Sequence, residues 1–144
     1  QGKFREDSGR APVVVLRSGR DITLAGYGAE INELLEAAEL LAARGIQAEV
    51  VKWNIITPLE TEVLVQSVRQ TGHLLVAEEC AEQGCVGVRA LAALENAGVL
   101  ARTGLVNCGR GYVTHGKVEL LKESLGLDGD SLFRRAMEVL GREP

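Results

Sequence analysis

Two adjacent carboxylates, Glu78 and Glu79, follow directly after the apolar run 74–77. An unpaired charge at the end of a buried strand is costly, so this pair needs a role. In α/β proteins, ligands and partner surfaces lie at the carboxyl ends of the strands. The pair is therefore a site, an interface or a capping device. In the capping interpretation Glu79 is solvated, and Glu78 accepts hydrogen bonds from backbone amides at a neighbouring helix start.

Gly26 and Gly28 lie between a predicted strand and a predicted helix, as glycines do in a dinucleotide-binding turn. The full fingerprint requires a third glycine, but Ile31 occupies that place. It also requires an acid at the tip of the next strand, where the chain reads Val51-Lys52-Trp53. We therefore expect the two glycines to let strand and helix pack closely, rather than to bind a nicotinamide or flavin cofactor.

The cysteines and histidines offer further reactive groups. Cys80, Cys85 and Cys108 show no zinc-binding spacing, and Cys85 alone lies just before a helix, where a thiol can be activated. We interpret the three as reduced, non-catalytic residues, which fits a cytoplasmic protein. His73 and His115 are interpreted as turn or capping residues, and a metal site is not expected.

Length and composition indicate one globular domain with an aliphatic core. The chain has 144 residues, 46% of them hydrophobic and only 3% aromatic. Its net charge of −4, without a basic stripe, argues against nucleic-acid binding. No apolar run reaches the ~18 residues that a membrane span needs, and no secretory signal is visible. Neither a nucleophile elbow nor a phosphate loop occurs.

Hydrophobic periodicity and capping residues predict alternating strands and helices. Strands are predicted at 13–16, 21–24, 48–51, 73–77 and 104–107, the first two flanking 17–20 in a hairpin or a tight return. Helices are predicted at 31–42, ended by Gly45; from Thr57 to about Gln70; at 86–97, ended by Gly98; at 117–125; and at 130–140, with Asp128 or Asp130 as a cap.

The predicted start of the second helix, at Thr57, depends on a capping pattern. Thr57 would be the N-cap, Pro58 would lie in the first turn, and Glu60 would follow three residues after the cap. Alternation of this kind is typical of right-handed βαβ units with a mostly parallel sheet covered on both faces. We expect residues 1–11 to form a flexible arm or linker and residues 12–144 to form the domain.

Several segments occur together in a recognisable order. They are 21–28, 37–41, 45–51, Thr57-Pro58-Leu59, 76–79, and a tail from His115-Gly116 through 120–121 to 125–128. Over residues 14–140 this order resembles the C-terminal domain of transketolase-like thiamine-diphosphate enzymes. The tail is most similar to 1-deoxy-D-xylulose-5-phosphate synthase or to the C-terminal subunit of a split transketolase. The family commonly follows its Glu-Glu with Gly-Gly-x-Gly, whereas residues 83–87 read Gln-Gly-Cys-Val-Gly, with one glycine replaced.

The resemblance implies a three-layer α/β/α domain whose mixed, mainly parallel sheet has about five strands. It implies a larger, homodimeric enzyme with two further domains, which transfers two-carbon units from pyruvate or a ketose phosphate. Thiamine diphosphate and Mg²⁺ would be bound by those other domains, since the Gly-Asp-Gly motif followed by Asn is absent here. This chain, whether an excised domain or a separate subunit, would then serve assembly and be inactive alone.

The resemblance, together with the residue types, assigns interface or structural roles to eight residues. They are Glu78, Glu79, Gly26, Gly28, Pro58, Gly84, Gly87 and His115. Two alternatives remain open. One is a freestanding nucleotide-binding or regulatory α/β module that uses the Gly26–Gly28 turn. The other is the β-chain of a 2-oxoacid dehydrogenase, which shares the fold and differs in its partner.

Overall fold

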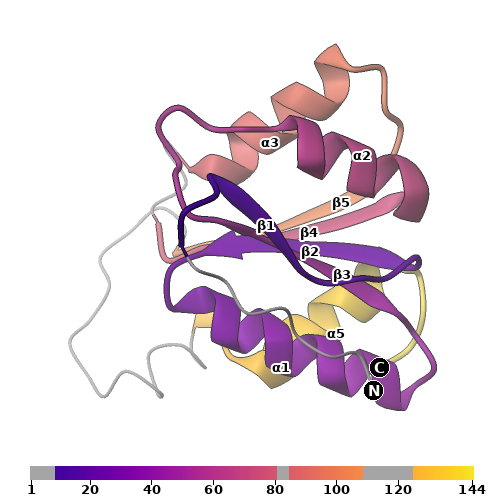
Figure 1. The fold of residues 1–144 in the computed structure, drawn as a ribbon. Coiled ribbons are helices and arrows are strands. Elements are labelled where there is room, and N and C mark those ends of the chain that lie inside the picture. Colours follow the sequence, from indigo (N-terminus) through magenta and orange to yellow (C-terminus); the bar gives the residue numbers. More distant parts are fainter. Residues whose placement is uncertain (1–8, 81–84, 109–124) are drawn as a thin grey trace.

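A computed structural model describes residues 9–80, 85–108 and 125–144 (Figure 1). Strands and helices alternate along most of this part of the chain. The elements are β1 (Val13–Arg17), β2 (Ile22–Tyr27), α1 (Glu30–Ala43), β3 (Ala48–Trp53), α2 (Glu62–Thr71), β4 (His73–Ala77), α3 (Val86–Asn96), β5 (Arg102–Val106) and α5 (Gly129–Val139).

The strands form one five-stranded mixed sheet in the order β1-β3-β2-β4-β5. β3, β2, β4 and β5 are mutually parallel, and β1 pairs with β3 in the antiparallel direction. Helices α1 and α5 cover one face of the sheet, and α2 and α3 cover the other (Figure 1). This arrangement confirms the predicted three-layer α/β/α fold with a mainly parallel sheet.

Two aliphatic clusters fill the spaces between the layers. Because successive side chains of a strand point to opposite faces, Leu75 packs in the cluster beneath α1 and α5, while Leu74 and Val76 pack in the cluster beneath α2 and α3. Both faces of β4 are therefore buried. A strand buried on both sides reads as a continuous apolar run, which is the pattern seen before Glu78.

Of the two connections predicted between the first two strands, the hairpin is wrong and the tight return is what the structure shows. β1 and β2 do not pair with each other; each pairs with β3, which lies between them. The connection wraps around the start of β3, where the amides of Arg20 and Asp21 both donate to the carbonyl of Gln47. Gly19 lies so close to the backbone of Ala48 that a Cβ atom would stand 2.2 Å from the carbonyl carbon.

Helix α2 begins later than its sequence predicts. Residues 56–59 form a turn closed by a bridge between Ile56 and Leu59, and the Thr57–Pro58 peptide bond is cis. The helix begins at Glu62 because the Glu60 carboxylate accepts hydrogen bonds from the first amides of the helix. Glu60 is thus the capping residue, whereas the pattern assigned that role to Thr57.

The other helix boundaries follow the predicted signals. Gly45 and Gly98 come just after α1 and α3, with φ of +75° and +69°. Asp128 caps α5 by accepting a hydrogen bond from the amide of Ser131 at 3.2 Å. The helix predicted at 117–125 lies almost wholly outside the described residues, as does the larger part of the arm predicted at 1–11.

Candidate functional site at the carboxyl edge of the sheet

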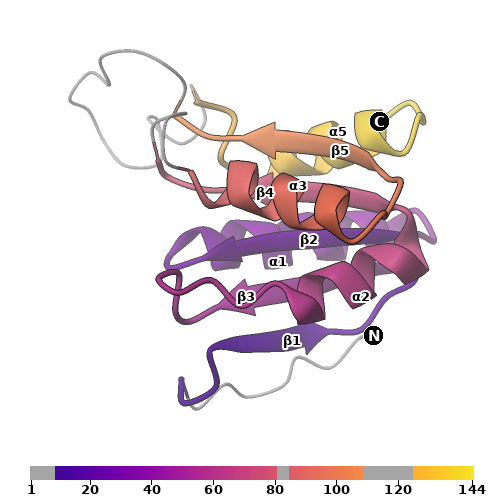
Figure 2. The ribbon, with the colours of Figure 1, turned by 90° about the horizontal axis from the view of Figure 1, so that it is seen from above.

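Strands β2, β3 and β4 all end on one side of the sheet, and helices α1, α2 and α3 begin there (Figure 2). We call this side the carboxyl edge. It brings the Gly26–Gly28 turn and the Glu78-Glu79 pair to neighbouring strands, because β2 and β4 are adjacent. The two motifs singled out in the sequence therefore lie side by side.

Glu78 is the most firmly held acid of the carboxyl edge. Its side chain is buried, with 2% of the residue exposed. One carboxylate oxygen accepts a hydrogen bond from the amide of Val86 and the other from the amide of Gly87, each at 2.8 Å. These are the predicted bonds from Glu78 to a helix start, and they account for a carboxylate in a buried position. Glu79 is exposed.

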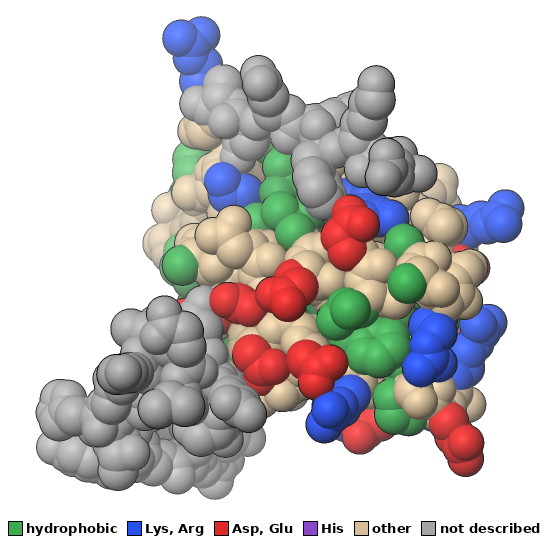
Figure 3. Space-filling model, turned by 90° about the horizontal axis from the view of Figure 1, so that it is seen from below, with side chains coloured by type: hydrophobic (Ala, Val, Ile, Leu, Met, Phe, Trp, Pro, Cys, Tyr) green, Lys and Arg blue, Asp and Glu red, His purple; other side chains and the backbone are tan. Residues whose placement is uncertain are grey.

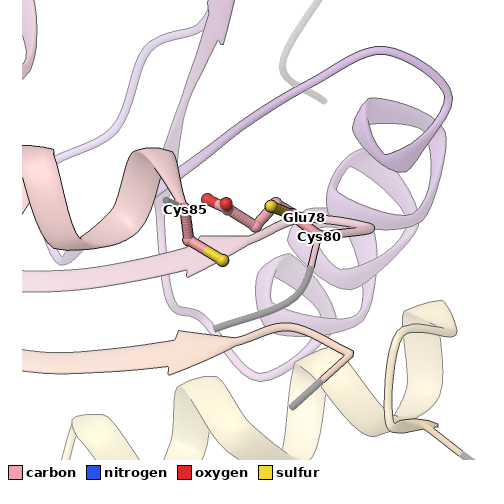
Figure 4. Close-up of side chains that lie close together, drawn as sticks. All are labelled: Glu78, Cys80 and Cys85. Carbon is pink, nitrogen blue, oxygen red and sulfur yellow. The ribbon is translucent and has the colours of Figure 1, made fainter. Parts of the chain in front are cut away.

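Two cysteines join Glu78 where β4 ends and α3 begins (Figure 4). A carboxylate oxygen of Glu78 and the sulfur atoms of Cys80 and Cys85 all lie within 4.8 Å of one another. Cys85 is the buried N-cap residue of α3. Burial, followed by hydrogen bonds with Cys80 and Glu78, raises the pKa of the Cys85 thiol. This thiol is therefore not activated as a nucleophile.

The sequence analysis did not predict this cluster. The four residues between Cys80 and Cys85 are at the upper end of the spacing common in structural zinc sites, but the third member of the cluster is a carboxylate at a strand end rather than a cysteine or histidine. The available signal was the position of Cys80 and Cys85 on either side of one strand-to-helix connection. None of the described cysteines forms a disulfide, and Cys108 lies outside the cluster.

Carboxylates stand at the start of every helix in the described part of the chain. Glu30 is buried in the first turn of α1, Glu60 accepts from the amide of Glu62 in α2, Glu78 caps α3 and Asp128 caps α5. A helix N-terminus otherwise attracts phosphate groups. At each described helix start a carboxylate therefore stands where the helix would otherwise favour a phosphate group. The sequence analysis missed Glu30, although an acid in a first helical turn is a common signal.

The outer face of α1 and α5 adds to this charge. Figure 3 shows acidic side chains gathered on part of this face. Helix α1 carries Glu33, Glu36 and Glu39, of which Glu36 and Glu39 are exposed. Glu33 also accepts a hydrogen bond from the amide of Gly129 at the start of α5, at 3.0 Å. The same face carries cationic side chains as well, including the exposed Arg134 and Arg135 of α5.

The glycines of the first turn serve packing and backbone geometry. A Cβ atom on Gly26 would stand 2.7 Å from a methyl group of Leu34 and 2.8 Å from the carbonyl oxygen of Ala77. Strand β2 can therefore approach α1 and β4 only with glycine at this position. Gly28 has φ of +62°, a left-handed conformation that disfavours other residues.

The remaining predicted residues are dispersed. Gly87 lies in the first turn of α3, where a Cβ atom would stand 2.8 Å from a methyl group of Leu105. Pro58 is exposed in the turn before α2. Nδ1 of His73 lies 2.9 Å from the carbonyl oxygen of Thr71, the contact expected of a turn histidine. Gly84 and His115 lie outside the described residues.

Among the described residues, no helix is both long enough and apolar enough to cross a lipid bilayer.

These features define an α/β domain whose sheet is covered on both faces and whose carboxyl edge is rich in acids and thiols. Residues 11–132 match the family model described as transketolase, C-terminal domain, and the chain belongs to this family.

Individual relatives support the same assignment. The chain is 36% identical over 125 residues to 1-deoxy-D-xylulose-5-phosphate synthase of Heliobacterium modesticaldum, covering 87% of this chain and 19% of that protein. It is 36% identical over 131 residues to the 6-deoxy-6-sulfo-D-fructose transketolase subunit SqwH of a Clostridium species, covering 90% and 40%. A pyruvate dehydrogenase E1 component subunit beta from Staphylococcus epidermidis is 36% identical over 99 residues, covering 69% and 30%.

Among solved structures, a split-gene transketolase described as an inactive β4 tetramer is similar to this chain. The two superpose with a TM-score of 0.79 and 30% identity, over 98% of this chain and 45% of the other. The chain thus spans about a fifth of the length of the synthases it matches and less than half of the split subunit.

Proposed function

We propose that this chain is the C-terminal assembly domain, or a separate subunit, of a transketolase-type enzyme that uses thiamine diphosphate and Mg²⁺. The parent enzyme is a cytoplasmic homodimer that transfers two-carbon units, as in 1-deoxy-D-xylulose-5-phosphate synthase. Other domains or subunits bind the cofactor, and this chain supports them from the side. Its membership of the family and its short span relative to whole enzymes support this proposal. The free cysteines are in keeping with a reducing compartment.

The observation that carries the proposal is the set of carboxylates at the helix starts. Thiamine diphosphate presents a diphosphate that needs amide donors or cations around it. The Glu78 carboxylate already accepts hydrogen bonds from the first amides of α3, and the Glu60 carboxylate accepts one from the first amide of α2. An acidic chain with these helix starts fits a supporting role better than a diphosphate-binding role.

The carboxyl edge also carries apolar side chains suited to a domain junction. Ile55, just after β3, is 45% exposed, and Val88, in the first turn of α3, is 50% exposed. Tyr27 is partly exposed at the end of β2, on the same edge. We take this edge as the face on which the other domains or subunits dock, with Glu78 holding α3 in place behind it.

Calorimetry tests the cofactor part of the proposal. The isolated chain is titrated with thiamine diphosphate in the presence of Mg²⁺, and no binding is expected. Micromolar binding would show that the chain contains a cofactor site and would overturn the supporting role.

Substitutions at the carboxyl edge test the docking part. In the enzyme purified with all its domains or subunits, Ile55→Asp and Val88→Asp are each expected to weaken assembly by about 2 kcal/mol or more, because an aspartate buried at an interface loses its water. Sedimentation velocity measures the fraction assembled.

Leu100→Asp is the matched control for this experiment. Leu100 is 97% exposed but lies between α3 and β5, at the opposite edge of the sheet. It is expected to leave assembly unchanged. If Leu100→Asp weakens assembly and the two carboxyl-edge variants do not, the docking face is assigned to the wrong edge.

One second candidate has an observation in its favour. The 36% identity to a pyruvate dehydrogenase β subunit supports the alternative that the parent is a 2-oxoacid dehydrogenase. Capture of a lipoyl-carrying acyltransferase by the assembled enzyme would favour this parent. The freestanding nucleotide-binding module gains no such support, because Gly26 is accounted for by packing. A thermal-shift screen with adenine, nicotinamide and flavin nucleotides is expected to show no shift of several degrees.

A further inference from the structure

We propose that Glu78, Cys80 and Cys85 form a binding site for a zinc ion at the carboxyl end of β4. Their ligand atoms, one carboxylate oxygen and two sulfurs, lie within 4.8 Å of one another. The three side chains come from the strand end, the residues just after it and the N-cap of α3 (Figure 4). The site is separate from the proposed cofactor chemistry and does not depend on it.

The three ligand atoms, within 4.8 Å of one another, can be compared with the ligands of a tetrahedral zinc site. With Zn–S bonds of about 2.3 Å and Zn–O bonds of about 2.1 Å, neighbouring ligand atoms stand about 3.6 to 3.8 Å apart. From the 4.8 Å limit of the cluster, zinc binding requires its ligand atoms to approach one another by up to about 1 Å. Two thiolates and a carboxylate match the preference of Zn²⁺, whereas Mg²⁺ and Ca²⁺ prefer oxygen ligands alone.

The backbone around the cluster holds its ligands in position. The Glu78 carboxylate is fixed by the amides of Val86 and Gly87, and each oxygen retains a further lone pair for a metal. The carbonyl of Cys80 accepts a hydrogen bond from the amide of Cys108 at 2.9 Å, which ties the Cys80 backbone to the end of β5. Such outer hydrogen bonds orient metal ligands in established sites.

Zinc binding would exchange thiol protons for the metal. Two thiols lie beside a buried carboxylate. Binding therefore releases the thiol protons to the buffer while both sulfurs coordinate the metal as thiolates. The described residues supply three ligands to the ion.

Titration of the reduced chain with Zn²⁺ tests the site. We expect a one-to-one complex by calorimetry. Because binding releases protons, the measured binding enthalpy is expected to change with the ionisation enthalpy of the buffer. Co²⁺ in place of Zn²⁺ is expected to give a thiolate-to-cobalt charge-transfer band. Cys80→Ser and Cys85→Ser are each expected to weaken binding by more than about 100-fold, the upper end of what loss of a supporting outer contact costs.

Two further variants separate the site from general effects on the fold. Cys108→Ser removes the cysteine outside the cluster and is expected to bind Zn²⁺ as the unaltered chain does. Glu78→Gln is expected to weaken binding but to keep the charge-transfer band, because both thiolates remain. Circular dichroism without metal checks that each variant is folded.

Three results would overturn the proposal. The first is a reduced, folded chain that takes up no Zn²⁺. The second is equal loss of binding in Cys108→Ser and Cys80→Ser, which would place the metal elsewhere. The third is a chain that binds no Zn²⁺ while oxidised glutathione joins Cys80 and Cys85 in a disulfide, which would make the cluster a thiol pair.

Discussion

Helices α1 and α3 begin after adjacent strands but on opposite faces of the sheet, and each is joined to its strand in a different way. Each helix follows a central parallel strand, β2 or β4, and each begins at the carboxyl edge. At α1 the connection is short and built on Gly26 and Gly28, so the backbone itself makes the close approach. At α3 the connection is longer, and the Glu78 side chain reaches from the strand to the helix amides.

The difference explains why the connection before α1 resembles a dinucleotide-binding turn, whereas the connection before α3 contains reactive side chains. A glycine turn beside a helix start is the geometry of a dinucleotide site, but the buried Glu30 in the first turn of α1 opposes a phosphate there. At α3 the Glu78 carboxylate accepts hydrogen bonds from the first helix amides and also places a negative charge beside Cys80 and Cys85. The first start is suited to packing, and the second is suited to a cation.

The largest expected effect comes from removing the side chain that holds α3. Glu78→Ala leaves the amides of Val86 and Gly87 without their acceptor in a buried position and is expected to lower the free energy of unfolding by about 3–4 kcal/mol. Urea unfolding measures the change. Glu78→Gln keeps one acceptor oxygen and is expected to lose roughly half as much.

Glu79→Ala is the matched control for this change. Glu79 is the neighbouring acid but is exposed, so its removal is expected to shift stability by less than about 0.5 kcal/mol. Equal losses at positions 78 and 79 would mean that the contacts of Glu78 with α3 are not what stabilises this edge.

An intermediate loss of stability is expected when a methyl group is added at the start of α1, where Gly26 is already in close contact with its neighbours. Gly26→Ala places a Cβ atom against Leu34 and the Ala77 carbonyl and is expected to cost about 1–3 kcal/mol. The loss is measured by thermal or urea unfolding. Gly28→Ala meets nothing within 4 Å and bears only the left-handed conformation, which costs about 1–2 kcal/mol. A Gly26→Ala chain as stable as the unaltered one would contradict the packing role.

The sequence predicted the elements well wherever local signals agree. Apolar spacing and a following glycine placed α1 and α3, and the continuous apolar run before Glu78 placed β4. The start of α2 was misplaced because two capping signals compete within a few residues. Thr57 matches the pattern, but the turn at 56–59 leaves Glu60 to cap the helix.

Features that depend on which segments meet in space were beyond local reasoning. Nothing in residues 13–24 specifies that β3 lies between β1 and β2, since that order follows from packing across the whole sheet. The Cys80–Cys85 grouping likewise arises only because α3 begins beside the end of β4. The bonds from Glu78 to a helix start could be predicted, because a buried carboxylate at a strand end has few other ways to be satisfied.

The smallest expected effect concerns Tyr27, which ends β2 and senses the cluster at the start of α3. Burial, followed by the electrostatic effects of Glu78, Cys80 and Cys85, raises the pKa of Tyr27 to about 12. The pKa of tyrosine in an unfolded chain is about 10, so the unfolded chain releases this proton first. The stabilising contribution is therefore complete below about pH 10 and is lost as the pH rises to about 12.

Tyr27→Phe removes this titration and is expected to flatten the fall in the free energy of unfolding between about pH 10 and 12. Urea unfolding at a series of pH values measures the difference between the two chains. Glu78→Gln provides the link between the two helix starts: it removes the largest of the charges that act on Tyr27, so phenolate absorbance should appear at lower pH. If the absorbance titration is unchanged in Glu78→Gln, the end of β2 and the start of α3 are electrostatically independent, and the comparison between them reduces to packing alone.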